Sequence, residues 1–130
     1  SLSPCVHSIL AAQLGYQDKA VEMYQRTARL DLDNINNDTV DGLHITSMAG
    51  SWLAIAHGFA GMRTTAGLSL NPFLPKQWTG YAFQFHYRDR LIRVKVQPGL
   101  ATVELLEGRP LTITLCGEEM TLETSVCHSI

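Results

Sequence analysis

The sequence lacks a long apolar run, an excess of basic residues and any paired arrangement of cysteines. No apolar segment reaches the roughly 18 residues that a membrane-spanning helix needs, so no such helix is expected. The 10 Lys and Arg against 12 Asp and Glu give a net charge of −2, which provides no general affinity for nucleic acid or anionic membranes. Cys5, Cys116 and Cys127 form neither a CxxC pair nor a cysteine–histidine zinc spacing. We therefore expect free thiols in a reducing cytoplasm and no structural metal.

The first residues also lack a starting methionine and a basic signal segment. A chain that begins at Ser1 and runs directly into a helical pattern is expected to be a piece of a longer protein. The 130 residues are 45% hydrophobic and 17% charged, which is typical of folded rather than disordered chains. This length fits one domain, or a small domain with part of another.

The first half of the sequence has helical periodicity. Apolar residues spaced three and four apart predict helices over residues 4–14, 18–30 and 45–59. The third segment is apolar almost all round and rich in Ala and Gly, so we expect it to be deeply buried, with Trp52 in the core. Residues 31–43 are rich in Asp and Asn, which bond nearby backbone amides, and they are predicted to form a loop.

The aspartates of this predicted loop allow two interpretations. A calcium site is one, but the spacing lacks the glycine and glutamate positions of a calcium-binding loop. A loop that caps the neighbouring helices is therefore favoured. The aspartates concerned are Asp31, Asp33, Asp38 and Asp41.

From about residue 63 the apolar period becomes two. Alternation over residues 81–88, 91–96, 102–105 and 111–115, with turn residues between, predicts an antiparallel sheet or sandwich. Helices followed by strands, without interleaving, predict the α+β class. We expect two domains, a helical one over residues 1–62 and a small antiparallel β-sheet domain over residues 63–130.

Four strings of this sequence resemble glycoside hydrolase family 65. They are SLSPCVHS (1–8), TARLDLD followed by NNDT (27–39), DGLHITSMAGSW (41–52) and LNPFLPKQW (70–78). The family includes maltose, trehalose and kojibiose phosphorylases. The resemblance implies that residues 1–62 are the last helices of an (α/α)6 catalytic barrel, and that residues 63–130 are the C-terminal β-sheet domain.

The resemblance also implies a reaction. Such enzymes cleave an α-glucosyl disaccharide with inorganic phosphate and invert the anomeric carbon, which gives β-glucose 1-phosphate. A glutamic acid protonates the glycosidic oxygen, and phosphate replaces the water that an inverting hydrolase activates. In the family this acid lies upstream of the matched region. No catalytic residue is therefore expected in this chain, and the chain alone should be inactive.

The same resemblance implies part of a phosphate site. Ser1 and His44 match family residues that bind phosphate, and both precede predicted helices, whose free amides favour anions. Asp41 is expected to orient His44 without contacting phosphate. Without the resemblance, Ser1 is more typical of a helix-cap hydroxyl, and His44 could equally bond locally at a helix N-terminus.

Maltose is the first expectation for the substrate. A family 65 hydrolase acting on trehalose or kojibiose, and a non-catalytic C-terminal module, stay open as alternatives. The expected partners are the disaccharide, phosphate, the remainder of the parent chain and a second parent copy in a homodimer. Neither nucleic acid nor a membrane is expected as a partner, and no cofactor is implied.

Overall fold

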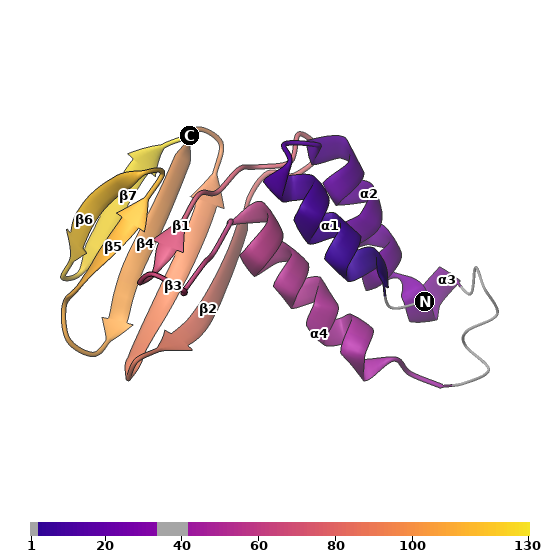
Figure 1. Cartoon of the computed structure of the whole chain (residues 1–130), viewed down its shortest axis with the longest axis horizontal. Coiled ribbons are helices and arrows are strands. Elements are labelled where there is room, and N and C mark those ends of the chain that lie inside the picture. Colours follow the sequence, from indigo (N-terminus) through magenta and orange to yellow (C-terminus); the bar gives the residue numbers. More distant parts are fainter. Residues whose placement is uncertain (1–2, 34–41) are drawn as a thin grey trace. The chain divides into compact units, whose positions relative to one another are not determined.

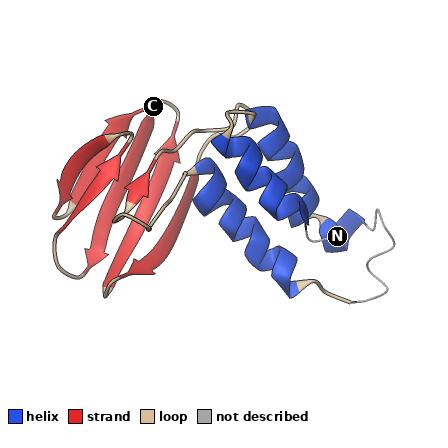
Figure 2. Cartoon of the chain, in the orientation of Figure 1, coloured by secondary structure: helices blue, strands red, loops and turns tan. Residues whose placement is uncertain are grey.

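The computed structural model describes residues 3–33 and 42–130, and the chain divides into two compact units after Phe59 (Figures 1 and 2). The first unit is helical and the second is built from strands, which confirms the α+β class expected from the change in periodicity. Within the described ranges, every helix is too short or too polar to cross a membrane.

Helices α1 (Ser3–Gln13) and α2 (Gln17–Ala28) form a hairpin in the first unit. Gly15 ends α1 with a φ of 80°, and its amide donates to the carbonyl of Ala12. A glycine adopts this left-handed conformation without a steric penalty, so α1 ends where the sequence predicts. The hairpin is tight, because the buried hydroxyl of Ser8 donates to the carbonyl of Ala20 at 2.7 Å.

Helix α4 (Ile45–Leu53) continues directly into a π-helical segment, η2 (Ala54–Phe59). Gly50 lets α4 approach the hairpin closely, since a Cβ atom there would lie 3.1 Å from the Cβ and Sγ atoms of Cys5. At the end of η2, Phe59 is fully buried, and its ring centroid lies 5.5 Å from that of Tyr24 in α2. Helix α4 and η2 therefore share one core with α1 and α2.

The expectation of deep burial is wrong for the first part of the third helical segment. Ile45 is 75% exposed, Met48 is 53% exposed, and Trp52, expected in the core, is 38% exposed. Among the apolar side chains of this segment, full burial is confined to η2, at Ala54, Ala56 and Phe59, while the buried residues of α4 are Ser47 and Gly50. In this chain the hairpin covers one face of α4, so a sequence that is apolar almost all round leaves a second face uncovered.

The loop predicted over residues 31–43 also differs from the structure at its start. Residues Leu30–Asp33 form one helical turn, α3. The amides of Leu32 and Asp33 both donate to the carbonyl of Arg29, at 2.9 and 3.0 Å. This turn therefore continues almost directly from α2, and it fixes the direction of the aspartate side chains.

The second unit contains two sheets. One has four antiparallel strands in the order β2-β3-β4-β7, and the other has three strands in the order β1-β5-β6. Among the described strands, β1 alone pairs in parallel, with β5, because the intervening β2–β4 meander provides the long connection that parallel strands need. The strands are β1 (Ser69–Leu70), β2 (Tyr81–Tyr87), β3 (Arg90–Gln97), β4 (Leu100–Glu107), β5 (Leu111–Leu115), β6 (Glu118–Leu122) and β7 (Ser125–Ser129).

The core of this unit follows the predicted two-residue alternation. In β3, Ile92, Val94 and Val96 are fully buried, and their counterparts in β5 are Ile113 and Leu115. Alternate residues of a strand point to opposite faces, so each sheet has one apolar face turned into this core.

Candidate functional site

His44 is the predicted phosphate ligand that lies within the described residues, and it immediately precedes α4. Its backbone is not helical, with φ −92° and ψ 82°, while its carbonyl accepts the amides of Ser47 and Met48 at 2.9 and 3.2 Å. His44 is therefore the N-cap residue of α4, beside the first-turn amides that favour an anion.

The side chain of Asp31 holds His44 at two points. Its Oδ2 atom accepts the backbone amide of His44 at 2.8 Å, and its Oδ1 atom lies 2.6 Å from His44 Nδ1. The side chains are 24% exposed for His44 and 13% for Asp31. The hydrogen bond from the ring, followed by that from the amide, lowers the pKa of the Asp31 carboxyl below its ordinary value of 3.8. Asp31 is therefore an ionised acceptor at neutral pH.

The neighbouring Asp33 has a different partner. It accepts Arg29 Nε at 2.7 Å, and this hydrogen bond lowers the pKa of its carboxyl. Residues two apart on a helical turn point in different directions. The single turn α3 thus directs Asp31 to His44 and Asp33 to an exposed arginine, 58% accessible, so the two carboxylates do not compete for one partner.

A groove of about 450 Å³ lies beside this pair, between the end of α2, α3 and the start of α4. Two of its hydroxyls are already engaged, because Thr27 donates to the Met23 carbonyl and Ser51 to the Ser47 carbonyl, each at 3.0 Å. The groove therefore offers mostly apolar surface, with Asp31 as its charged group. Its lining residues are Thr27, Ala28, Asp31, Leu32, Leu43, Ser47, Met48 and Ser51.

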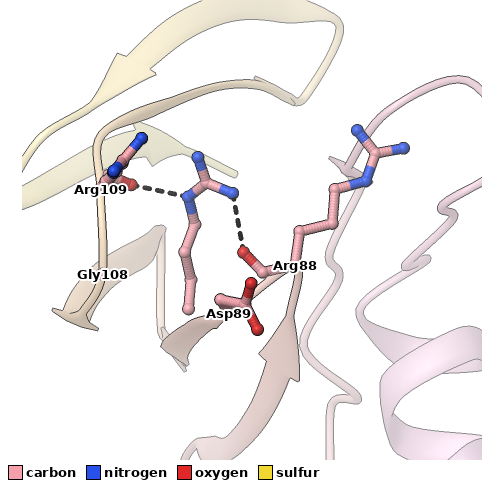
Figure 3. A pocket seen from close by; sticks show the side chains of 5 residues that line it. Arg88, Asp89, Gly108 and Arg109 are labelled. Atoms are coloured by element: carbon pink, nitrogen blue, oxygen red, sulfur yellow. Dashed lines mark hydrogen bonds between the residues drawn. The ribbon is translucent and has the colours of Figure 1, made fainter.

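A second hollow, of about 580 Å³, lies between the β2–β3 turn and the segment after β4 (Figure 3). Its central arginine, Arg90, donates to the carbonyls of Arg109, Arg88 and Pro110 at 2.6, 3.0 and 3.2 Å. Since these bonds join the β2–β3 turn to the segment after β4, Arg90 acts as a structural clamp. Sequence reasoning does not predict this role, because the carbonyls come from two separate turns.

The described residues contain no group of three or more His, Cys, Asp or Glu side chains that could hold a metal ion. Four aspartates were considered for a calcium loop, and the structure describes two of them. Asp31 is bonded to His44, and Asp33 is bonded to Arg29.

Comparison with known families decides the origin of these two units. The model of the glycosyl hydrolase family 65 central catalytic domain matches residues 1–53, and that of the family 65 C-terminal domain matches residues 62–122. The chain belongs to glycosyl hydrolase family 65. It corresponds to the C-terminal portion of a family 65 protein, with the end of the catalytic domain followed by the β-sheets of the C-terminal domain.

Similar proteins carry the names of phosphorylases. Maltose phosphorylase of Bacillus subtilis (strain 168) is 58% identical over 124 residues, and α,α-trehalose phosphorylase of Geobacillus stearothermophilus is 52% identical over 120. These alignments cover 95% and 92% of this chain but only 16% of each relative. A solved structure described as a putative kojibiose phosphorylase from the human microbiome is 32% identical, with a TM-score of 0.91 over 99% of this chain and 19% of that one.

The family 65 site predicted from the sequence is only partly described. Ser1 and Asp41 lie outside the described residues, and His44 is placed at the start of α4. The contact of Asp31 with His44 was not predicted from the sequence, where this residue was placed only in a helix-capping loop. The clue is a carboxylate in TARLDLD, but nothing in the string shows that a helical turn carries it to a histidine 13 residues later.

Proposed function

We propose that this chain is the C-terminal part of an inverting disaccharide phosphorylase, and that His44 helps to bind its inorganic phosphate. The observation that carries the proposal is the 58% identity, over 95% of this chain, to a protein named maltose phosphorylase. Support for the role of His44 comes from its position before the first turn of α4, where a ligand oxygen would meet both an imidazole and a helix N-terminus.

In the proposed reaction, phosphate attacks the anomeric carbon of an α-glucosyl disaccharide and the glycosidic bond to the second sugar breaks. A glutamic acid of the longer protein protonates the leaving oxygen, so the products are β-glucose 1-phosphate and a free sugar. His44, together with Ser1, holds phosphate oxygens, and this chain supplies no catalytic acid. The isolated chain should therefore be inactive.

Maltose is the proposed substrate, because the relative of 58% identity bears its name. The proposed partners besides disaccharide and phosphate are the remainder of the longer chain and a second copy in a homodimer. No cofactor is required by this chemistry. A cytoplasmic location is proposed from the free thiols of Cys5, Cys116 and Cys127.

The test is the phosphate dependence of disaccharide cleavage by the full-length protein that contains this chain. Maltose, trehalose and kojibiose are each incubated with and without phosphate, and glucose 1-phosphate is quantified. The proposal predicts that cleavage of maltose requires phosphate and that His44→Ala raises the KM for phosphate. Phosphate-independent release of glucose would instead identify a hydrolase, and no cleavage of any disaccharide would favour a non-catalytic role.

A further inference from the structure

The contact between Asp31 and His44 constrains the histidine more than one hydrogen bond would. One carboxylate accepts from the backbone amide through Oδ2 at 2.8 Å and meets the ring through Oδ1 at 2.6 Å. The first bond fixes the carboxylate relative to the main chain at the start of α4. The second then fixes the rotation of the imidazole about its own side-chain bonds. The carboxylate of Asp31 therefore holds both the backbone and the ring of His44 in place.

The contact also decides which ring nitrogen carries a proton. An ionised carboxylate has no proton to donate, so a 2.6 Å contact between Oδ1 and Nδ1 requires the hydrogen on Nδ1. The lowered pKa of Asp31 keeps this carboxyl ionised at neutral pH. With Nδ1 engaged, Nε2 is the ring atom left for a ligand. In metal and catalytic sites, histidines are oriented in the same way, by donating one ring N–H to a carboxylate.

The neighbouring cation, Arg29, does not compete with His44 for the carboxylate of Asp31. Arg29, the cation that directly precedes the same turn, is bonded to Asp33 through both Nε and Nη2. The interactions that lower the pKa of Asp31 all come from His44. Asp31 is therefore engaged with the histidine, while Asp33 on the same turn serves as a natural comparison.

We propose that Asp31 is the positioning residue of the phosphate site: it holds His44 with Nδ1 protonated and turned to the carboxylate, so that Nε2 faces the phosphate. This inference rests on the proposed function. It assigns Asp31 no contact with substrate, and it predicts an effect on phosphate rather than on the disaccharide.

The test uses the full-length protein and steady-state phosphorolysis of maltose, with phosphate and maltose varied separately. Asp31→Asn keeps the shape of the side chain and an oxygen for the His44 amide, but it replaces the ionised acceptor. We expect the KM for phosphate to rise by about tenfold to a hundredfold, the range for losing a charge-assisted hydrogen bond, with the KM for maltose unchanged. Asp33→Asn, which removes a carboxylate from the same turn, is the matched control and should leave both values unchanged.

A double-mutant cycle separates positioning from a merely structural effect. In the His44→Ala background, Asp31→Asn should add nothing to the KM for phosphate, because the residue that it positions is already absent. Equal effects of Asp31→Asn with and without His44, or equal effects on both substrates, would overturn the inference. So would a phosphate KM within about twofold of the unaltered protein.

The outcomes distinguish this inference from the function on which it rests. Phosphate-dependent cleavage with an unaffected Asp31→Asn variant contradicts the inference alone, whereas cleavage without phosphate contradicts both. Thermal unfolding of each variant shows whether the fold is retained. If Asp31→Asn does not fold, Asp31→Glu decides the question: it keeps the charge but shifts the carboxylate by one methylene. A selective rise in the phosphate KM then supports the inference, and an unchanged KM overturns it.

Discussion

Asp31 and Asp33 have different hydrogen-bond partners, although they lie on one helical turn. Asp31 bonds a histidine ring and amide, and Asp33 bonds an exposed arginine. The sequence shows both as acidic residues near a predicted helix end, and the resemblance of the surrounding string makes His44 a candidate phosphate ligand. It does not identify the pair, because the pairing depends on how α3 directs its side chains and on where α4 begins. Partners 13 residues apart have no fixed geometry without that turn.

The stability of this pair should depend on pH with a defined sign. His44 lowers the pKa of Asp31 below 3.8, so the folded state favours the ionised carboxyl more than the unfolded state does. The contribution is present in full above the unfolded pKa, and it is lost as the pH falls from about 4 through the lower folded pKa. We predict that the difference in Tm between the unaltered chain and Asp31→Asn is larger at about pH 5 than at about pH 3. An undiminished difference at about pH 3 would contradict this assignment.

Gly108 lies in the segment after β4 and lines the same hollow as Arg90 (Figure 3). Its φ is 106°, and a Cβ atom there would lie 2.7 Å from Arg90 Cγ and 2.9 Å from the Asp89 carbonyl oxygen. Gly108→Ala should therefore lower the free energy of unfolding by about 2 kcal/mol or more in urea titrations. Gly99 is the control: its φ is 76°, but a Cβ atom added there would meet nothing within 4 Å, so its replacement by Ala should cost less. Equal losses would show that the steric contact is unimportant.

Four strands, β2 to β5, were predictable from the sequence, whereas β1, β6, β7 and the details of the helical unit were not. Tyr81, Phe83 and Phe85 alternate with smaller or polar residues, and they form β2 at the predicted place. Strand β1 has only two residues, too few to show a period. The π-helical segment η2 has no sequence signal either, because Ala, Ile and Phe suit an α-helix equally well. The uncovered face of α4 was not predictable, because periodicity shows that a segment is apolar but not what covers it.

Segment η2 should be the point at which the helical unit is most sensitive to substitution. Phe59 is fully buried there and packs against Tyr24 of α2. Phe59→Ala removes this ring and leaves a cavity, so we expect a loss of about 3–5 kcal/mol in the free energy of unfolding of the helical unit. Met48→Ala, at a 53% exposed position of α4, serves as the comparison and should cost far less. Similar losses at both positions would show that the core is not centred on η2.

The exposed apolar residues of α4 and of the segment after α1 should make the isolated chain self-associate. Leu14, Ile45 and Met48 are each more than half exposed, at 70%, 75% and 53%. Water-exposed apolar surface of this kind drives association between copies. We predict that light scattering shows oligomers of the isolated chain at raised concentration, and that the double substitution Ile45→Lys with Met48→Lys shifts them toward monomer at unchanged Tm. A monomeric unaltered chain would contradict this account.

The molecule contains two compact units that match two successive parts of one family, and it spans 16% of the length of curated relatives such as the maltose phosphorylase. The class of each unit followed from hydrophobic period alone, since the change from helical to alternating spacing occurs near the observed division after Phe59. Membership of the family was predicted from four longer strings and their order along the chain. The disaccharide does not follow from either, because the described residues carry no group assigned to sugar recognition.

The most direct test of the account is phosphorus NMR of the full-length protein acting on maltose in phosphate buffer. We predict that the phosphate signal declines while that of β-glucose 1-phosphate grows, and that His44→Ala slows this conversion at low phosphate concentration more than at high. Formation of glucose with no change in the phosphate signal, or formation of the α-anomer of glucose 1-phosphate, would contradict it.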